Sequence, residues 1–471
     1  MSLAKTHTRT NHTTMRTSTL FVLSLALLSA LDLPAQGRGR RGRRFGPPPQ
    51  QAPAPEPPKE EKKKEPKEHL AIVGGDVYIG TGQRLTGATV LIADDKIEKV
   101  GHNLELPEGT EVIDAKGKCV SPGFVIVEGS GMGTGFSGPY KDTVNPFDPS
   151  IKQGLAAGIT SFLVGSTSSR GRVGGSNAVI KTHYGDIDGM VLVENSVYGV
   201  SVPLQISQKQ QLKDQIKQCR DYLKAVEEYP AKKAKDAKAK EPKPPKGADA
   251  VLKVLQGKAK LWVSMGGGGM GMFRSMMGGG SSASDLDKIR EALDVSRMFG
   301  RGVVIQKPMS AWMIPDEIAN TGSSVIWSPR TRAAPDPKDP DHTGSNLAQA
   351  AILDKAGVAV AVTCPSGRFG GSGVGTGGIL GQDLNTPHID AAYAVRGGLK
   401  NRKALRTITL DAAKMIGVGD RIGSLEAGKD ADILILDGDP LHYGTFVTTA
   451  VVNGKVVYEK GKEALFKHIE R

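Results

Sequence analysis

The feature that most constrains the fold is a regular alternation of strand-like and helix-like segments through the middle of the chain. Short apolar runs rich in β-branched residues are followed by longer amphipathic stretches, and this order repeats between residues 122 and 421. Strand and helix in turn predict a parallel α/β architecture, and the length suits a closed (β/α)8 barrel of the TIM type. The strand-like runs are 159–164, 260–264, 302–306, 323–327 and 358–362, and the helix-like stretches are 208–228, 284–298, 347–355, 388–398 and 403–416.

Both flanks of this region are rich in short strand-like runs. Residues 70–121 contain AIVGGDVYIGTG and ATVLIADDKIEKVG, and residues 422–465 contain ADILILDGDP and TAVVNGKVVYEKG. Each run is bounded by Gly, Asp or Pro, which is typical of strands that end in turns. We therefore expect a small β-sandwich domain that is formed by both ends of the mature chain.

The first 35 residues have the three-part layout of a signal peptide. A basic segment precedes an apolar run at 20–31, and small residues follow up to Ala35, where we expect cleavage. The run is shorter than the roughly 20 apolar residues that a membrane anchor needs, and no later segment is long and apolar enough to span a bilayer. The sequence therefore predicts an exported protein, periplasmic or secreted, without a transmembrane helix.

The net charge of +13 is concentrated outside the expected folded body. Residues 36–69 carry ten basic and five acidic side chains, and residues 230–247 carry seven basic and two acidic ones, with little that is apolar in either segment. Such segments cannot bury enough apolar surface to offset the entropy cost of folding. We expect a disordered linker at 36–69 and a disordered insertion at 230–247 within the barrel domain, 122–421. Because the rest of the chain is close to neutral and has no nucleic-acid motif, we expect no nucleic-acid partner.

The two ends of the expected folded body carry long motifs that resemble a known family. Residues 71–124, AIVGGDVYIGTGQRLTGATVLIADDKIEKVGHNLELPEGTEVIDAKGKCVSPGF, are similar to the opening of the amidohydrolase superfamily. Residues 411–440, DAAKMIGVGDRIGSLEAGKDADILILDGDP, are similar to its closing signature, in particular that of imidazolonepropionase-like and Xaa-Pro-dipeptidase-like members. The resemblance implies a TIM-type barrel with a small β domain, metal-dependent hydrolysis of C–N bonds at the barrel mouth, and a homodimer as a common assembly.

The metal ligands that this resemblance implies are replaced at their expected positions. Where the family pattern has His-x-His after the first barrel strand, the chain has Glu128 and Ser130. The two later histidine positions hold Ser264 and Lys307, and the aspartate position holds Cys364. Zinc sites in such enzymes need neutral imidazoles and a carboxylate, whereas a lysine brings positive charge to the place of a cation.

Weaker candidates for a rebuilt site remain. Lys181 could be the bridging carboxylated lysine that the resemblance implies for two-metal members, and His183 could join Glu128 as a metal ligand. The Met/Gly-rich segment 265–280 could hold Cu(I) through its thioethers, although we favour a pliable apolar loop at the mouth. Cys364 is a conceivable nucleophile, but no partner base is evident from the sequence.

Two hypotheses follow from these residues. In the first, the chain is a non-catalytic descendant of an amidohydrolase that binds a small molecule, a peptide or a partner protein at the old barrel mouth and needs no cofactor. In the second, it hydrolyses amides, peptides or cyclic amides at a rearranged site that contains zinc. The loss of the histidines favours the first hypothesis.

Overall fold

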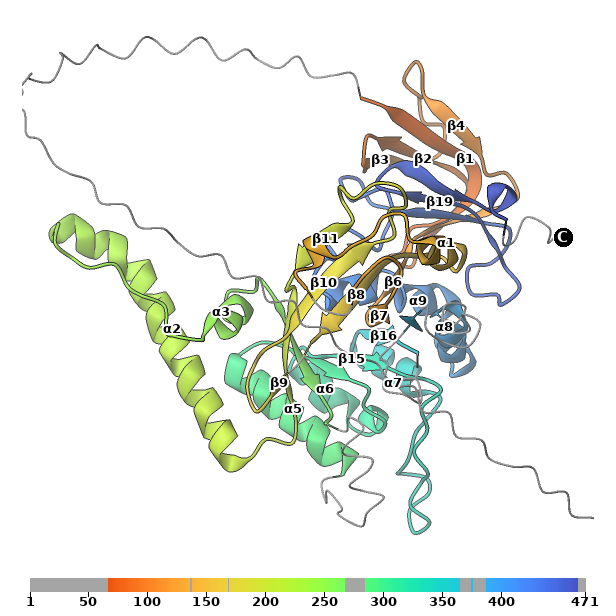
Figure 1. Cartoon of the computed structure of the whole chain (residues 1–471). Helices are drawn as coiled ribbons and strands as arrows, with labels where there is room; N and C mark the ends of the chain where they lie inside the picture. The colour runs from red at the N-terminus through yellow and green to blue at the C-terminus, as the bar shows by residue number, and fades with distance from the viewer. Residues whose placement is uncertain are drawn as a thin grey trace, which may run out of the picture. The chain divides into compact units, whose positions relative to one another are not determined.

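The computed structural model describes residues 67–135, 138–167, 169–266, 284–364, 374–375 and 387–464 (Figure 1). The expected signal peptide, nearly all of the expected linker and most of the Met/Gly-rich segment lie outside these residues. Among the helices that are described, none combines the length and the apolar character needed to cross a bilayer.

Both ends of the described chain contribute strands to one eight-stranded sheet. Its order is β20-β19-β18-β5-β1-β2-β3, and β4 pairs with β1 outside this path. The joint between the two ends is the antiparallel pairing of β18 with β5, which sets Ile435 opposite Val120. The strands that we expected to form a sandwich are thus hydrogen-bonded in a single sheet. They are β1 (His69–Tyr78), β2 (Arg84–Ala93), β3 (Lys96–Gly101), β4 (Glu111–Asp114), β5 (Cys119–Pro122), β18 (Ile433–Leu436), β19 (Val447–Val452) and β20 (Lys455–Glu459).

The two faces of this sheet bury different sets of side chains because successive residues of a strand point to opposite faces. In β18, Ile433 and Ile435 pack in the core of the small domain with Val120. Leu434 and Leu436 pack instead in the large core that contains the helices of the α/β part. The continuous apolar run of β18 therefore reflects burial on both faces.

The middle of the chain forms the α/β part, in which a six-stranded parallel sheet has the order β16-β15-β14-β13-β12-β9. A four-stranded sheet has the order β11-β10-β8-β6, in which β6 and β8 are parallel and β10 is antiparallel to both of its neighbours. The strands are β6 (Phe124–Ile126), β8 (Ile159–Ser166), β9 (Ser169–Arg170), β10 (Ser176–Lys181), β11 (Val191–Glu194), β12 (Val197–Ser201), β13 (Lys260–Ser264), β14 (Val304–Gln306), β15 (Ser324–Trp327) and β16 (Val360–Val362).

The α/β class is confirmed, but the strands of the described residues do not pair into a closed ring. On one side, residues 407–408 join the two sheets, because the N–H of Val362 donates to the carbonyl of Thr407 (3.1 Å) and the N–H of Val125 donates to that of Ile408 (2.7 Å). On the other side, Asn177 of β10 links β8 to β12. Its side-chain amide donates to the carbonyl of Ser166 in β8 (3.1 Å) and to that of Val197 in β12 (2.7 Å). The expected closure is interrupted here because β8 pairs with the antiparallel strand β10.

The expected helices are present in the expected order, with two differences in extent. The stretch 403–416, which we expected to form one helix, forms two, α9 (Asn401–Arg406) and α10 (Leu410–Met415). Helix α2 (Ile206–Lys235) runs beyond the predicted end at residue 228 and into the segment that we expected to be disordered. Alanine and lysine favour helix strongly enough to continue α2 past Pro230. The other helices are α1 (Pro149–Ala156), α3 (Asp249–Leu255), α5 (Asp285–Phe299), α6 (Pro315–Asn320), α7 (Gln349–Lys355) and α8 (Pro387–Arg396).

One apolar layer fills the space between the strands of the α/β part. Trp262 of β13 is fully buried, and its indole N–H donates to the carbonyl of Met415 at the end of α10 (2.8 Å). Val304 and Ile326 supply the layer from the next two strands. One pleat further along these strands the inward side chains become polar, which locates the candidate site at the carboxyl ends of the strands.

Candidate functional site

The carboxyl ends of three strands bring polar side chains together. Glu128 lies two residues after β6, Gln306 ends β14 and is followed by Lys307, and Thr363 follows β16. Parallel strands present their carboxyl ends at the same edge of a sheet, so these side chains meet at the mouth of the α/β part.

The centre of the mouth is an ion pair between Glu128 and Lys307. The Lys307 Nζ lies 2.6 Å from Glu128 Oε2, and the two side chains are only 24% and 11% exposed, respectively. The Gln306 amide donates to Glu128 Oε1 (3.1 Å), and the Thr363 hydroxyl donates to Oε2 (3.3 Å). Both carboxylate oxygens therefore already accept hydrogen bonds from the protein.

The backbone at Lys307 is held in an unusual conformation. Its φ is +52°, in the left-handed region that non-glycine residues rarely adopt. Its N–H nevertheless donates to the carbonyl of Ile326 (2.7 Å), so the pairing of β14 with β15 continues through this residue. Holding a lysine in this region costs on the order of 1 kcal/mol, and such strain concentrates at functional sites.

The residues at the mouth do not fit the metal that the family resemblance implies. Gln306 and Thr363 are neutral and donate to Glu128, and the fourth member, Lys307, is itself a cation. Across the parts of the chain that the structure describes, no three His, Cys, Asp or Glu side chains are grouped so as to hold a metal ion. A divalent ion at Glu128 would have to displace Lys307, and it would find one carboxylate there.

Of the residues expected at the mouth from the sequence, the structure brings Glu128 and Lys307 into contact. Ser264 ends β13, where its carbonyl accepts a hydrogen bond from the N–H of Val202 (2.9 Å). Ser130 lies in the short strand β7 (Gly129–Ser130), which pairs with β17 (Val374–Gly375). No hydrogen bond to Glu128 is described for either serine.

Sequence reasoning missed three polar neighbours of the pair. Gln306 and Thr363 donate directly to the carboxylate of Glu128, and the Gln306 amide also reaches the hydroxyl of Thr167 (3.4 Å). Two of them stand immediately before Lys307 and Cys364 at strand ends. A search for polar side chains on the same face of each strand end would have found them.

Cys364 belongs to a different group at the end of β16. It is buried, and its thiol interacts with both Arg330 and Asp390. Arg330 binds the carboxylate of Asp390 through two hydrogen bonds of 2.7 and 3.2 Å. Burial raises the pKa of Asp390, although Arg330 and Cys364 oppose the shift. The thiol therefore lies beside an ion pair other than the one that contains Lys307.

Lys181 lies at the junction with the small domain. It is fully buried on β10, and its Nζ donates to Asp430 (2.7 Å), Asp432 (3.1 Å) and Asn453 (2.6 Å). Burial opposes ionisation of Asp430, but Lys181 and the nearby cations Lys96 and Arg421 keep the pKa of that carboxyl below its usual value. This cluster ties β10 to the segments that flank β18 and β19.

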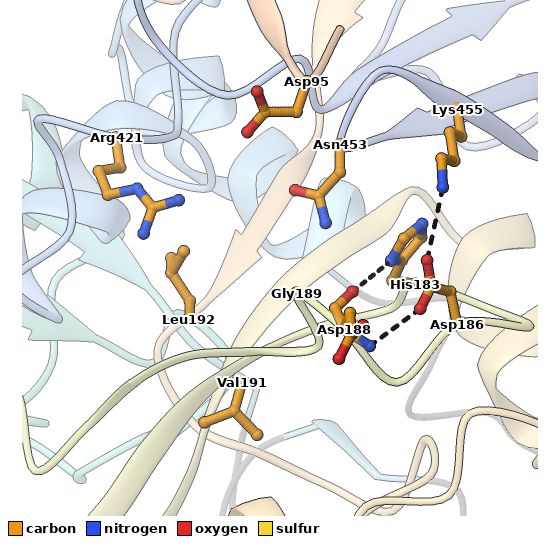
Figure 2. A pocket seen from close by; sticks show the side chains of 10 residues that line it. All are labelled: Asp95, His183, Asp186, Asp188, Gly189, Val191, Leu192, Arg421, Asn453 and Lys455. Carbon is orange, nitrogen blue, oxygen red and sulfur yellow. Dashed lines mark hydrogen bonds and ion pairs between the residues drawn. The ribbon is translucent and has the colours of Figure 1, made fainter. Parts of the chain in front are cut away.

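His183 lines a pocket of about 290 Å³ at the same junction (Figure 2). The ring is almost completely buried, and its Nδ1 donates to the carbonyl of Asp188 (3.1 Å). Asp186 and Lys455 also line the pocket, and they form an ion pair in which Lys455 Nζ lies 3.4 Å from Asp186 Oδ2. Glu128 does not line this pocket, so the structure does not bring His183 and Glu128 together.

Of the Met/Gly-rich segment, only Met265 and Gly266 are described, and the suggested copper ligands beyond them lie outside the described residues.

Comparison with known proteins agrees with this scaffold. The model of the amidohydrolase family matches residues 151–463. An amidohydrolase from Thermotoga maritima MSB8 of known structure superposes with a TM-score of 0.57 at 25% identity, over 83% of this chain and 100% of that one.

Two curated relatives match in shorter segments. The imidazolonepropionase of Thermoplasma volcanium is 35% identical over 82 residues, which are 16% of this chain and 20% of the relative. Amidohydrolase tasK of Hapsidospora irregularis is 35% identical over 78 residues, 16% of this chain and 8% of the relative. The matches thus span a fifth or less of the length of these relatives. The family model covers most of this chain and confirms the resemblance seen in its terminal motifs: the chain belongs to the amidohydrolase family.

Proposed function

We propose that this chain is a ligand-binding member of the amidohydrolase family in which the ion pair of Glu128 and Lys307 stands in the place of the catalytic metal. The observation that carries this proposal is the 2.6 Å contact between Lys307 Nζ and Glu128 Oε2. The family fold and the strand-end position of the pair support it as well.

The positive charge of Lys307 is the physical reason why a metal ion would be excluded from Glu128. A metal bound at Glu128 would lie within a few ångströms of the lysine ammonium, and two like charges at such a distance repel strongly in a partly buried site. Glu128 Oε2 already binds Lys307 and Thr363, and Oε1 accepts from Gln306, so a metal would compete with these three donors for the carboxylate. Without a metal, none of the groups that the structure describes at the mouth would acidify a water molecule as zinc does in hydrolases of this type.

The mouth retains groups that suit a small polar ligand. Glu128 and Lys307 offer both signs of charge, and Thr167, Gln306 and Thr363 offer neutral hydrogen-bonding groups. A short peptide or another small amide-containing molecule presents the complementary donors and acceptors. We propose this class of ligand, and with it an exported protein whose mature chain begins at Gln36.

Elemental analysis by mass spectrometry tests the loss of the metal. The full-length protein is produced in medium with zinc, manganese and copper and is dialysed without chelator. The expected result is less than a tenth of an equivalent of any metal per chain, and no hydrolysis of Xaa-Pro dipeptides or of hydantoin. One or two equivalents of zinc together with hydrolysis would overturn the proposal and establish the alternative, a hydrolase of C–N bonds, which family membership favours. Copper without zinc would direct attention to the Met/Gly-rich segment.

Calorimetric titration with a dipeptide panel tests the binding half of the proposal. We expect at least one dipeptide to bind, and Lys307→Met to weaken that binding by tenfold or more. Lys455→Met is the matched control, because it removes an ammonium group from the pocket of His183 and leaves the mouth unchanged. Binding that is equally strong in wild type and Lys307→Met would contradict a role for the mouth.

N-terminal sequencing of the protein recovered from periplasm or medium tests the export.

A further inference from the structure

A second pocket, of about 290 Å³, lies where the α/β part meets the small domain, away from the mouth. Phe124 is the first residue of β6, whereas Glu128 follows the other end of that strand, so the pocket and the mouth are at opposite ends of β6. Elements β6, α1, α8, β18 and β19 contribute to it. The lining residues that matter below are Phe124, His388, Leu436, Tyr443, Phe446 and Val447.

His388 is the notable polar member of this lining. Its Nε2 is buried and has no hydrogen-bond partner among the residues that the structure describes. Its ring stacks on Phe124 with the centroids 6.5 Å apart and an interplanar angle of 29°. Burial lowers the pKa of His388 to about 4, so the imidazole is neutral at ordinary pH. A buried polar atom without a partner costs about 1–3 kcal/mol, and such atoms often mark the place of a missing partner.

The remaining walls are mostly apolar or aromatic. Leu436 and Val447 come from the sheet, and Phe446 adds a ring whose face is covered by the ammonium of Lys460 at 4.8 Å. Tyr443 stands at the rim and is 80% exposed, although tyrosine usually buries most of its ring. An apolar concavity with few polar groups is the usual composition of a small-molecule site.

We propose that this pocket binds a flat aromatic molecule that carries a hydroxyl group, and that His388 Nε2 is the hydrogen-bond partner of this hydroxyl. The aromatic class follows from the stacked pair of His388 and Phe124 and from the exposed ring of Tyr443. The hydroxyl follows from the neutral imidazole, whose Nε2 donates in one tautomer and accepts in the other. A hydroxyl can do either, so it satisfies this nitrogen in both tautomers.

The test uses 2-naphthol, whose own fluorescence reports binding, and naphthalene as the isostere without the hydroxyl. Both are titrated into the full-length protein at pH 7.5. His388→Phe preserves a ring against Phe124 and removes the nitrogen. Tyr443→Ala changes an exposed rim residue and so leaves the fold intact. The matched control is His183→Phe, which makes the same substitution at an almost completely buried histidine that lines the other pocket at this junction.

We expect 2-naphthol to bind wild type at least tenfold more tightly than naphthalene. His388→Phe should abolish this preference while naphthalene binding is retained. Tyr443→Ala should weaken both probes severalfold, and His183→Phe should change neither. Lys307→Met should also leave both affinities unchanged, which separates this site from the proposed function of the mouth. Equal affinity of the two probes for wild type, no saturable binding of 2-naphthol, or unchanged binding in His388→Phe would each overturn the proposal.

Discussion

Lys307 occupies a position at which the family resemblance predicts a metal-binding histidine. Its ammonium contacts the carboxylate of Glu128, which follows the first strand of the α/β part. Residue types at strand ends could be read from the sequence, and so could the conflict between a lysine and a metal. The contact itself could not be read from the sequence, because Glu128 and Lys307 are far apart in the chain and only the parallel strands bring them together.

Removal of one partner of this pair is expected to destabilise the protein. Glu128→Gln and Lys307→Met should each lower the free energy of unfolding by about 1–3 kcal/mol, because each leaves a partly buried charge without its counterion. The double variant should lose less than the sum of the two. Urea denaturation measures all three. The exposed pair of Lys232 and Glu228 is the control, and Lys232→Met should cost under about 0.5 kcal/mol.

His388 predicts a pH dependence of stability. Because burial lowers its folded pKa to about 4, the unfolded chain takes up a proton between roughly pH 6.5 and 4 while the folded chain does not. The contribution of neutral His388 to the free energy of unfolding is complete above pH 6.5 and is lost as the pH falls toward 4. The upper limit of this loss is about 3 kcal/mol. Urea denaturation of His388→Phe from pH 7.5 to 4.5 should show a correspondingly smaller loss than wild type. An equal loss in both proteins would contradict the assignment to His388.

At the scale of elements, β10 carries the main difference between expectation and structure. Lys181 and His183 were candidates for the mouth, but β10 is antiparallel to β8 and its end points to the small domain. Strand β10 (Ser176–Lys181) was not among the strands expected from the sequence, and its residues alone do not indicate the direction in which it runs. The partners of Lys181, Asp430 and Asp432, come from a segment about 250 residues later, so no local signal revealed them.

The cluster at the end of β10 should be essential for the junction. Lys181→Met leaves Asp430 and Asp432 buried without their shared cation, and we expect a loss of about 3–5 kcal/mol in the free energy of unfolding. Lys96→Met is the control, since Lys96 also contacts Asp430 but is 38% exposed, and its loss should be clearly smaller. Equal losses in the two variants would show that burial of the lysine is not the deciding factor.

At the scale of the whole molecule, the sequence specified the scaffold better than the site. The motifs at 71–124 and 411–440 belong to the small domain and to α10, and they were sufficient to indicate the family. They contain no residue of the mouth. The α/β class followed from the alternation of elements, whereas the mixed sheet around β10 depends on long-range pairing that this alternation does not encode.

Metal addition and removal should leave the stability of the whole protein unchanged. A site whose Kd lies 100-fold below the free zinc concentration would add about 2.7 kcal/mol to the free energy of unfolding. We expect the same melting temperature with zinc, with manganese and with a chelator. A fall in melting temperature on chelation would show that a resident metal had been overlooked and would contradict the role given to Lys307.

The pairing of β18 with β5 also sets an order of events during synthesis. β5 emerges from the ribosome more than 300 residues before its neighbour, and until then one edge of that strand has no partner. The small domain therefore cannot be completed during synthesis until β18 and β19 have been made. A chain that ends before Ile433 is therefore expected to expose an unpaired strand edge of β5. We expect such a chain to aggregate or be degraded, even though it contains every described residue of the mouth.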